Sequence, residues 1–338
     1  MKDNRKIRVG IHGLGRIGRT FLRASLTQQI FEVVVVADLH DAHTMFHLLK
    51  YDSIHGKCDD FVWSEDGKWG HNDDYVTYYQ KSSKEEVPEW SKWQVDVVLD
   101  ATGVWKSQSQ LQQHLMQGVK KVFLSAPSEE KEIPMVVLGI NDEDIYKSSI
   151  ISCASCTTNS AAHMIQLIDE CCEIESCYIT TVHSYTGDQR LHDAPHHDWR
   201  RGRGALQSIV PTSTGAAKAL TRIFPALSEK MGGCGMRVPV PDGSLTDITS
   251  IVKNPLTIAE INSRFLNSTE GKWKGLVQYT ADPIVSSDVI GNTHSCVFDS
   301  ALTSVIGNMV KVVGWYDNEV GYSHRLCDLI TRWSHEKV

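Results

Sequence analysis

The sequence predicts an α/β protein of two domains: a mostly parallel sheet with helices comes first, and an α+β unit with a mainly antiparallel sheet follows. Three observations predict this class. A glycine-rich turn directly follows the first apolar run. Further apolar runs continue through the first half, whereas runs rich in β-branched or aromatic residues dominate the second. The 338 residues also exceed one ordinary core and suggest about two domains.

The first element is a strand at Ile7–Ile11, followed by the turn Gly13-Leu14-Gly15-Arg16-Ile17-Gly18. Apolar residues at helical spacing come next, and the strand-like run Val33–Ala37 ends at Asp38, twenty positions after Gly18. A strand, a glycine turn, a helix, a strand and an acid in this order predict a Rossmann dinucleotide-binding domain. The alternative is a glycine turn that only joins a strand to a helix.

Each residue of this motif has a predicted role. Gly13 makes the tight turn, Gly15 lets the backbone approach a pyrophosphate, and Gly18 allows close packing of helix on strand. Asp38 accepts hydrogen bonds from a ribose 2′-OH and repels a 2′-phosphate, which predicts NAD over NADP as the cofactor.

Further apolar runs at 95–99, 122–124 and 136–138 predict additional strands, with a helix-compatible segment at 108–117. The turn-prone groups after two of these runs contain Thr102 and Ser125. Ligands bind at the carboxyl ends of parallel strands, so both residues are expected to line the cofactor cleft. The polar stretch 57–92 fits either an added antiparallel segment or a surface excursion.

Cys156 is the strongest candidate for a nucleophile. Apolar residues lead into it as a buried strand does, and the helix-spaced residues that follow place it at a helix N-terminus. Unsatisfied N–H groups and the positive dipole end of a helix favour a thiolate. From the local sequence alone, a buried and inert cysteine is an equal alternative.

The second half supplies a candidate base. Strands are predicted at 178–183, 309–315 and near 247–252, and the first of them ends at His183, where an imidazole could take the Cys156 proton. Any one of the 15 histidines taken alone is more often structural. We expect no metal site, because the Cys and His residues lack zinc spacing. A thioredoxin-like use of Cys153-x-x-Cys156 is the competing reading of the thiol pair.

The sequence offers three candidates for phosphate binding: two segments and one single residue. Arg200–Gly204 offers guanidinium groups, and Pro211–Lys218 offers hydroxyl and N–H groups at a predicted helix start. Arg237 is the third candidate. A solvated basic loop with an ordinary helix cap would explain the same residues.

Composition excludes several classes. Apolar content of 41% and charged content of 22% are typical of globular proteins, and a net charge of −7 argues against nucleic acid as the main partner. No apolar stretch is long enough to cross a bilayer, and no signal-peptide segment precedes Ile7–Ile11. Nine scattered cysteines suit reduced thiols, so we expect a cytoplasmic protein.

On the residues named above, the chain resembles phosphorylating glyceraldehyde-3-phosphate dehydrogenase over nearly its whole length. The most specific match is Ala154-Ser155-Cys156-Thr157-Thr158-Asn159. Other matching segments are 13–19, 50–53, 102–104, 125–128, 183–186, 211–218, 237–239 and 315–319.

The resemblance implies a mechanism and a set of roles. Cys156 attacks the aldehyde of D-glyceraldehyde 3-phosphate, His183 is the base, and inorganic phosphate cleaves the resulting thioester to give 1,3-bisphosphoglycerate. The remaining implied roles are Thr186, Asp188 and Arg237 for the substrate phosphate; Ser155, Thr157, Thr214, Gly215 and Arg201 for inorganic phosphate; and Arg16, Ile17, Asn318 and Tyr322 for NAD. The resemblance also implies a homotetramer, in which the loop at about 184–207 lies against a neighbouring subunit's cofactor site. The implied domains are 1–155 with about 322–338 for NAD, and 156–321 for catalysis.

Some residues depart from the family pattern, and three other functions stay open. His12 and Cys153 each replace a usual Asn, Ser160 replaces a common second Cys, and Val240–Ser244 differs from the usual continuation after Arg237-Val238-Pro239. The alternatives are erythrose-4-phosphate dehydrogenase, an NADP-using paralogue, and a catalytically retired binding or regulatory protein on the same fold. The physiological direction and any additional role do not follow from the sequence.

Overall fold

The computed structural model describes residues 5–64, 68–71 and 74–335. Four segments lie outside the described residues. Two are the ends of the predicted cofactor domain, 1–4 and 336–338, and two belong to the polar stretch 57–92, at 65–67 and 72–73. The chain divides into two compact units. Unit 1 comprises 1–136, 142–154 and 323–338, and unit 2 comprises 137–141 and 155–322. Among the described residues, no helix has both the length and the apolar character needed to cross a bilayer.

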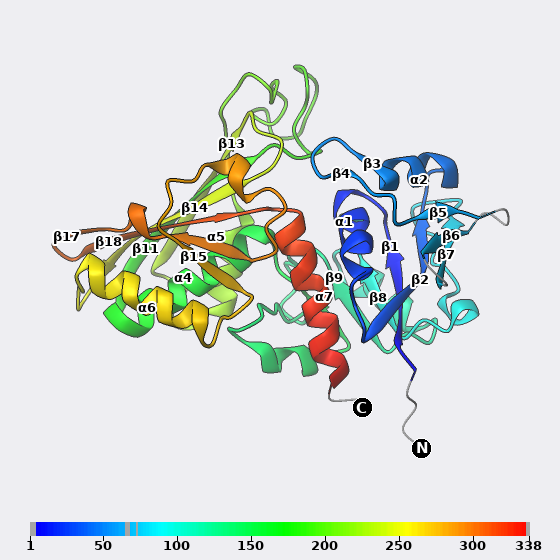
Figure 1. Ribbon diagram of the computed structural model, residues 1–338, viewed down its shortest axis with the longest axis horizontal. Coiled ribbons are helices and arrows are strands. Elements are labelled where there is room, and N and C mark those ends of the chain that lie inside the picture. The colour runs from blue at the N-terminus through cyan, green and yellow to red at the C-terminus, as the bar shows by residue number, and fades with distance from the viewer. Residues whose placement is uncertain (1–4, 65–67, 72–73, 336–338) are drawn as a thin grey trace. The chain divides into compact units, whose positions relative to one another are not determined.

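Unit 1 is built on an eight-stranded sheet in the order β10-β9-β8-β1-β2-β7-β6-β5. All neighbours from β10 to β7 are parallel, and β6 and β5 are added in antiparallel fashion. The strands are β1 (Ile7–His12), β2 (Phe31–Asp38), β5 (Val62–Trp63), β6 (Trp69–His71), β7 (Asp74–Gln80), β8 (Val97–Asp100), β9 (Lys121–Leu124) and β10 (Ile150–Ser152) (Figure 1). The polar stretch therefore contributes an added antiparallel segment to this sheet.

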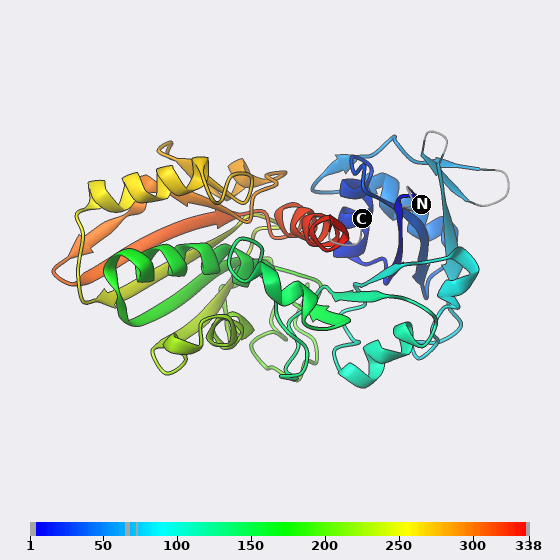
Figure 2. The same ribbon diagram turned by 90° about the horizontal axis from the view of Figure 1, so that it is seen from below.

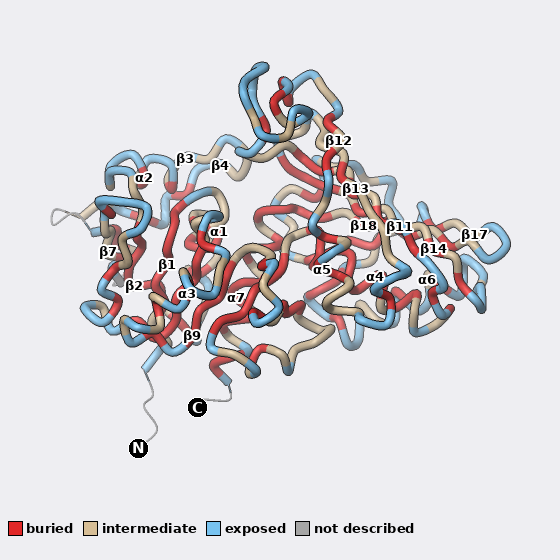
Figure 3. The backbone as a smooth tube through the Cα atoms, turned by 180° about the vertical axis from the view of Figure 1, so that it is seen from behind, coloured by how far each residue is buried: buried red, intermediate tan, exposed pale blue. Residues whose placement is uncertain are grey.

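The order of the central strands creates the binding edge of unit 1. From β1 the chain passes to β2 on one side of β1 and later to β8 on the other. This reversal is the switch point at which parallel α/β sheets bind ligands, beyond the carboxyl ends of their strands. Much of β1 is coloured as buried in Figure 3, and every residue of β8 is buried.

Helices and smaller elements complete unit 1. They are α1 (Arg16–Ser25), α2 (Ala42–Lys50), α3 (Gln108–Leu115), the part of α7 (Val320–His335) from residue 323, the β3 (Tyr51–Asp52) and β4 (Gly56–Lys57) pair, and two 3-10 turns at Trp90–Trp93 and Asp142–Tyr146. A full capping box at Ser107 and Gln110 starts α3 and satisfies its first N–H groups.

Unit 2 holds a mixed sheet in the order β12-β13-β11-β14-β18-β16-β15, with β17 paired to β18. Two pairings, β11 with β13 and β15 with β16, are parallel, and the others are antiparallel. The strands are β11 (Ile174–Ser184), β12 (Val210–Thr212), β13 (Met231–Val238), β14 (Ser244–Val252), β15 (Val277–Thr280), β16 (Cys296–Asp299), β17 (Ser304–Ile306) and β18 (Met309–Tyr316). The mainly antiparallel sheet predicted for the second half is confirmed.

Three helices pack on this sheet: α4 (Cys156–Cys172), α5 (Gly215–Ile223) and α6 (Ile258–Glu270). α4 contacts β14 and β18 and both other helices, and Figure 2 shows α4 in green beside α6 in yellow. Every second residue of β14 is buried, as expected for a strand with one covered face. Short 3-10 turns at Pro225–Leu227, Ser286–Val289 and Ser300–Leu302 connect these elements.

One predicted strand is wrong. The apolar run 136–138 forms no strand, and only Met135 makes an isolated bridge, to Ser152. The Val137 N–H instead donates to the side-chain oxygen of Asn141 at 2.9 Å, and the Ile140 N–H donates to the Val137 carbonyl. These local bonds turn the chain, and backbone groups used in a turn are not available to a sheet ladder.

Candidate functional site

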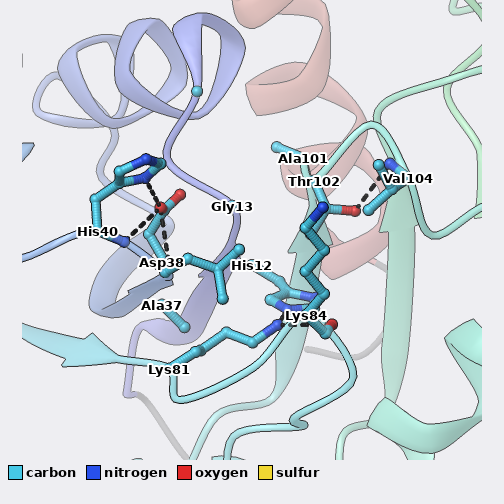
Figure 4. Close-up of a pocket in the computed structure, with 12 residues that line it drawn as sticks. His12, Gly13, Ala37, Asp38, His40, Lys81, Lys84, Ala101, Thr102 and Val104 are labelled. Atoms are coloured by element: carbon cyan, nitrogen blue, oxygen red, sulfur yellow. Dashed lines mark hydrogen bonds and ion pairs between the residues drawn. The ribbon is translucent and has the colours of Figure 1, made fainter.

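Unit 1 contains a cavity of about 260 Å³ at the carboxyl ends of β1, β2 and β8 (Figure 4). The residues that line it are His12, Gly13, Gly15, Ala37, Asp38, Leu39, His40, Lys81, Lys84, Ala101, Thr102 and Val104. Several of the predicted cofactor residues therefore meet in one cavity. Its position is the one that the strand order predicts for a ligand.

The three glycines of the turn have different structural roles. Gly13 has a φ of +93°, and a Cβ there would lie 2.7 Å from the Thr102 backbone. A Cβ at Gly18 would lie 2.3 Å from the Gly13 carbonyl oxygen. No atom lies within 4 Å of a Cβ built on Gly15, which lines the cavity. The backbone at Gly15 is thus open to a ligand, whereas Gly13 and Gly18 are required by packing.

Asp38 ends β2 as a preorganised acceptor. Its Oδ2 accepts the Leu14 N–H at 2.7 Å, and its Oδ1 accepts the Leu39 N–H at 2.7 Å and lies 3.0 Å from the His40 ring. Partial burial opposes the charge, yet these hydrogen bonds hold the pKa of Asp38 below its usual value. The carboxylate stays ionised at neutral pH, where it disfavours a second negative group beside it.

The other predicted cofactor residues are spread over both units. Arg16 begins α1 and pairs with Asp52, with 2.9 Å between Nη1 and Oδ2. Ile17 follows it in α1, and Ser125 follows β9 and donates its N–H to the Asp100 carbonyl. Asn318 and Tyr322 belong to unit 2 and are both buried.

Unit 2 places Cys156 at the first position of α4. Ser155 caps the helix, and its Oγ accepts the Thr158 N–H at 3.1 Å. Burial raises the pKa of the Cys156 thiol to about 11, while the charge of Arg237 acts to lower it. Ala154, just before the cap, has a φ of +58°, an uncommon conformation for a side chain with a Cβ. Cys153 is fully buried, which raises the pKa of its thiol strongly.

His183 lies near the end of β11, with its Nε2 3.5 Å from the Cys156 Sγ. Its Nδ1 lies 2.9 Å from the Ser184 carbonyl oxygen, which can only accept, and 2.7 Å from the Arg237 Nη1, which can only donate. The Arg237 Nη1 donates to the same carbonyl at 3.0 Å. Burial and then the Arg237 charge lower the pKa of His183 to about 3. The resting pair is therefore a thiol beside a neutral imidazole.

Sequence reasoning missed the role of Tyr316 beside this pair. The Tyr316 hydroxyl lies 2.9 Å from the Thr157 hydroxyl and 3.0 Å from the Thr181 hydroxyl, and its ring meets the His183 ring edge-on. The Thr157 side chain, predicted for inorganic phosphate, is thus engaged in a buried hydrogen bond. The only signal for Tyr316 was its place in the run Trp315–Glu319.

Asn318 is fixed by two hydroxyls. Its Oδ1 accepts the Ser184 Oγ at 2.9 Å and the Ser244 Oγ at 2.7 Å. The side-chain oxygen is thereby saturated, and the amide nitrogen is the group presented as a donor. This orientation suits recognition of a carbonyl group.

The predicted phosphate residues of unit 2 occupy a loop, a helix start and a strand. Asp188 pairs with Arg201 at 2.6 Å, and the N–H and hydroxyl of Thr186 both donate to Gln189. Thr214 caps α5, with Gly215 as the first helical residue. Arg237 on β13 contacts His183 and Ser184.

The charge of Arg201 acts on Arg237. Burial lowers the pKa of Arg237, and the charge of Arg201 acts in the same direction. Two neighbouring guanidinium charges favour a bound dianion, and the Asp188 carboxylate, which pairs with Arg201, acts against this effect. The N-terminus of α5, where the Thr214 Oγ accepts the Ala216 N–H, offers its other N–H groups to the same class of ligand.

Comparison with known proteins supports one family. Residues 7–108 match the model of the glyceraldehyde 3-phosphate dehydrogenase NAD binding domain, and residues 155–318 match that of the C-terminal domain. Glyceraldehyde-3-phosphate dehydrogenase of Mycobacterium avium is 47% identical over 96% of this chain and 97% of its own length. Glyceraldehyde-3-phosphate dehydrogenase 2 of Streptomyces avermitilis is 45% identical over 96% and 97%. The chain therefore belongs to the glyceraldehyde-3-phosphate dehydrogenase family.

Proposed function

We propose that this protein is a phosphorylating, NAD-dependent glyceraldehyde-3-phosphate dehydrogenase, with unit 1 as the cofactor domain and unit 2 as the catalytic domain. The observation that carries the proposal is the pairing of the Cys156 Sγ, at a helix N-terminus, with the Nε2 of His183 at 3.5 Å. Family membership supports the choice of substrate. The Asp38 carboxylate supports NAD over NADP, because it would repel a 2′-phosphate.

The residues suit a thioester mechanism. The Cys156 Sγ attacks the aldehyde carbon while its proton passes by way of the His183 Nε2 to the carbonyl oxygen, giving a thiohemiacetal and a neutral His183. NAD, when bound, accepts the hydride. His183 takes the hydroxyl proton as the carbonyl reforms, and phosphate oxygen then attacks the thioester carbon and releases the Cys156 sulfur. Arg237 is proposed to hold the substrate phosphate, with Thr186 and Asp188.

The other proposed binding roles are those that the resemblance to the family implies. The open backbone at Gly15 fits a pyrophosphate, with Gly13, Arg16, Ile17 and Gly18 forming the turn around it. Thr102 and Ser125 are proposed for the cofactor edge, and Asn318 and Tyr322 for the nicotinamide. For inorganic phosphate the proposed residues are Ser155, Thr157, Arg201, Thr214 and Gly215.

The first test is NADH formation by purified protein with glyceraldehyde 3-phosphate, NAD and phosphate. Parallel reactions omit phosphate, replace NAD with NADP, or replace the triose with erythrose 4-phosphate. We expect phosphate-dependent turnover with NAD and the triose. A preference for NADP would indicate the NADP-using paralogue, and a preference for the tetrose would indicate erythrose-4-phosphate dehydrogenase. No turnover in any reaction would contradict a catalytic function.

The nucleophile is tested by Cys156→Ser. We expect turnover to fall by at least about a thousandfold, because a serine hydroxyl beside a neutral imidazole forms no comparable nucleophile or thioester. The dissociation constant for NAD, measured by calorimetry, stays within about twofold of the parent value. Cys153→Ser is the matched control and retains turnover. Substantial activity in Cys156→Ser would assign the nucleophile to another residue.

We also propose a homotetramer in the cytoplasm. The loop between β11 and β12 exposes large apolar side chains to an unusual degree, with Trp199 89% exposed and Ile209 68% exposed. Exposed apolar patches of this kind mark surfaces that other proteins cover. All nine cysteines are free thiols, which supports a reducing compartment.

A further inference from the structure

Two buried carboxyl groups of unit 2 lie side by side at the end of the β14–β18 ladder. Asp242 and Asp317 are each 1% exposed, and a carboxyl oxygen of each lies within 4.8 Å of the other. The ladder ends with Ser244 opposite Tyr316, so Asp317 directly follows the last paired residue and Asp242 precedes it by two positions. Two ionised carboxylates this close and away from water repel each other, so such a pair is suited to share one proton.

Asp317 is the acceptor of the pair. Its Oδ1 accepts the N–H groups of Glu319 and Val320, at 2.8 and 2.7 Å, and its Oδ2 accepts the Gly291 N–H at 2.7 Å. A backbone N–H can only donate, so both oxygens of Asp317 already act as acceptors. The proton that the pair shares therefore belongs on Asp242.

The surroundings of Asp242 favour its protonated form. Burial, followed by the charges of Asp317 and Glu319, raises the pKa of Asp242 to about 8. A hydrogen bond to Asp317 acts in the same direction, and the Gly243 N–H, which the Asp242 Oδ1 accepts at 2.8 Å, opposes it. Within unit 2, Cys156 at the start of α4 is a further titratable group on which the charge of Asp242 acts. At neutral pH Asp242 thus carries a proton that it can donate to Asp317.

The turn that holds Asp242 is fixed by close packing and leads directly to a proposed cofactor residue. Gly243 has a φ of +82°, and a Cβ there would collide with the Ser286 carbonyl oxygen. The next residue, Ser244, donates its hydroxyl to the Asn318 Oδ1 at 2.7 Å. A displacement of the turn is therefore passed through Ser244 to the side chain of Asn318.

We propose that Asp242 is a positioning residue, whose hydrogen bond to Asp317 holds the Asn318 amide in the orientation that receives the nicotinamide of NAD. The inference rests on the proposed function, since it takes Asn318 as the nicotinamide residue. When Asp242 loses its proton, the repulsion between two buried carboxylates moves the turn and weakens NAD binding. Val240–Ser244 is a segment in which the chain departs from the family pattern, so the resemblance does not imply this role.

The test measures NAD affinity by calorimetry from pH 7 to 9.5 in the parent protein, Asp242→Asn and Asp242→Ala. In the parent protein the dissociation constant for NAD should rise about tenfold between pH 8 and 9.5, because the proton of the pair is lost there. An amide keeps a donor for Asp317 and does not titrate, so Asp242→Asn should bind NAD as the parent does at pH 7 and show a flat profile. Asp242→Ala lacks the donor and should bind NAD about tenfold more weakly at pH 7.

Three controls separate positioning from a general loss of structure. AMP lacks the nicotinamide, so its affinity should be the same in all three proteins and across this pH range. Asp282→Asn removes a carboxyl group from an exposed site of unit 2 and should keep the pH profile of the parent protein. The same series in the Cys156→Ser background excludes titration of the thiol as the cause.

Infrared difference spectroscopy detects the proton itself. The absorption band of a protonated carboxyl group should be present in the parent protein at pH 7 and disappear as the pH rises through about 8. Asp242→Asn should lack this band. A parent protein without the band at pH 7 would contradict the shared proton.

The outcomes distinguish the two proposals. NAD affinity that is independent of pH in the parent protein, or that falls equally in Asp242→Asn, overturns the role of Asp242. AMP affinity that falls together with NAD affinity shows a general loss of structure and also overturns it. A pH dependence that Asp242→Asn abolishes supports the inference even if the parent protein forms no NADH, a result that contradicts the proposed function alone. A parent protein that binds no NAD overturns both.

Discussion

The Arg237 guanidinium acts on both members of the Cys156–His183 pair. Its positive charge lowers the pKa of the His183 imidazole and opposes the rise that burial imposes on the Cys156 thiol. A neutral imidazole has one ring nitrogen without a proton, and this nitrogen is the one that can accept a thiol proton. The same cation therefore keeps the base unprotonated and favours the thiolate when the proton moves.

Arg237→Gln tests this effect on the thiol. Without the cation, the pKa of Cys156 should rise further above about 11, so less thiolate is present at any given pH. We expect alkylation of Cys156 by iodoacetamide at pH 8 to 9 to slow by about tenfold for each unit of added shift, with the profile displaced to higher pH. The measurement is the alkylation rate by mass spectrometry of the Cys156 peptide. Arg201→Gln is the control, and equal profiles for the two variants would refute the role of Arg237.

At the scale of elements, the turn between β1 and α1 separates packing from ligand binding. The Gly18 position is closed by the Gly13 carbonyl, whereas the Gly15 position is open. Alanine at position 18 should therefore reduce stability, whereas alanine at position 15 should reduce NAD binding.

We expect Gly18→Ala to lower the free energy of unfolding by about 1–3 kcal/mol, since a Cβ 2.3 Å from a carbonyl oxygen forces the turn to move. Gly15→Ala should change stability by less than about 1 kcal/mol, because its methyl group meets no protein atom. Its NAD affinity should nevertheless fall, because the methyl group occupies the approach to the pyrophosphate. Urea titration and calorimetry with NAD measure the two effects, and a Gly15→Ala protein with unchanged NAD affinity would contradict the assignment.

Sequence patterns predicted the elements better than the contacts between them. The apolar runs that became β1, β2, β8 and β9 were recognisable because local composition specifies a buried strand. The run 136–138 failed because a side chain four residues away, Asn141, took its backbone N–H. No local pattern could have indicated the Lys81–His12 contact, whose residues are 69 positions apart, or the Thr157–Tyr316 contact across 159 positions.

At the scale of the whole molecule, the exposed loop between β11 and β12 predicts association between copies of the chain. Trp199→Asp should weaken the oligomer, because a charge replaces the most exposed large apolar side chain of that loop. Light scattering coupled to gel filtration at micromolar concentration should show a smaller mass than for the parent protein. Met116→Asp, at a position 76% exposed in unit 1, is the control and keeps the parent mass. Equal masses for all three proteins would exclude Trp199 from the interface.

The division of the chain into units also sets an order of events during synthesis. Unit 1 begins with the first strand, yet it includes the part of α7 from residue 323, where Trp333 packs edge-on against Phe123 of β9. All of unit 2 from residue 155 is translated before that helix emerges. The cofactor domain is thus the first to start folding and the last to be finished, and a nascent chain halted before residue 323 carries a parallel sheet with part of its apolar surface uncovered. During synthesis, this uncovered surface of the unit 1 sheet is where a chaperone would have most reason to bind.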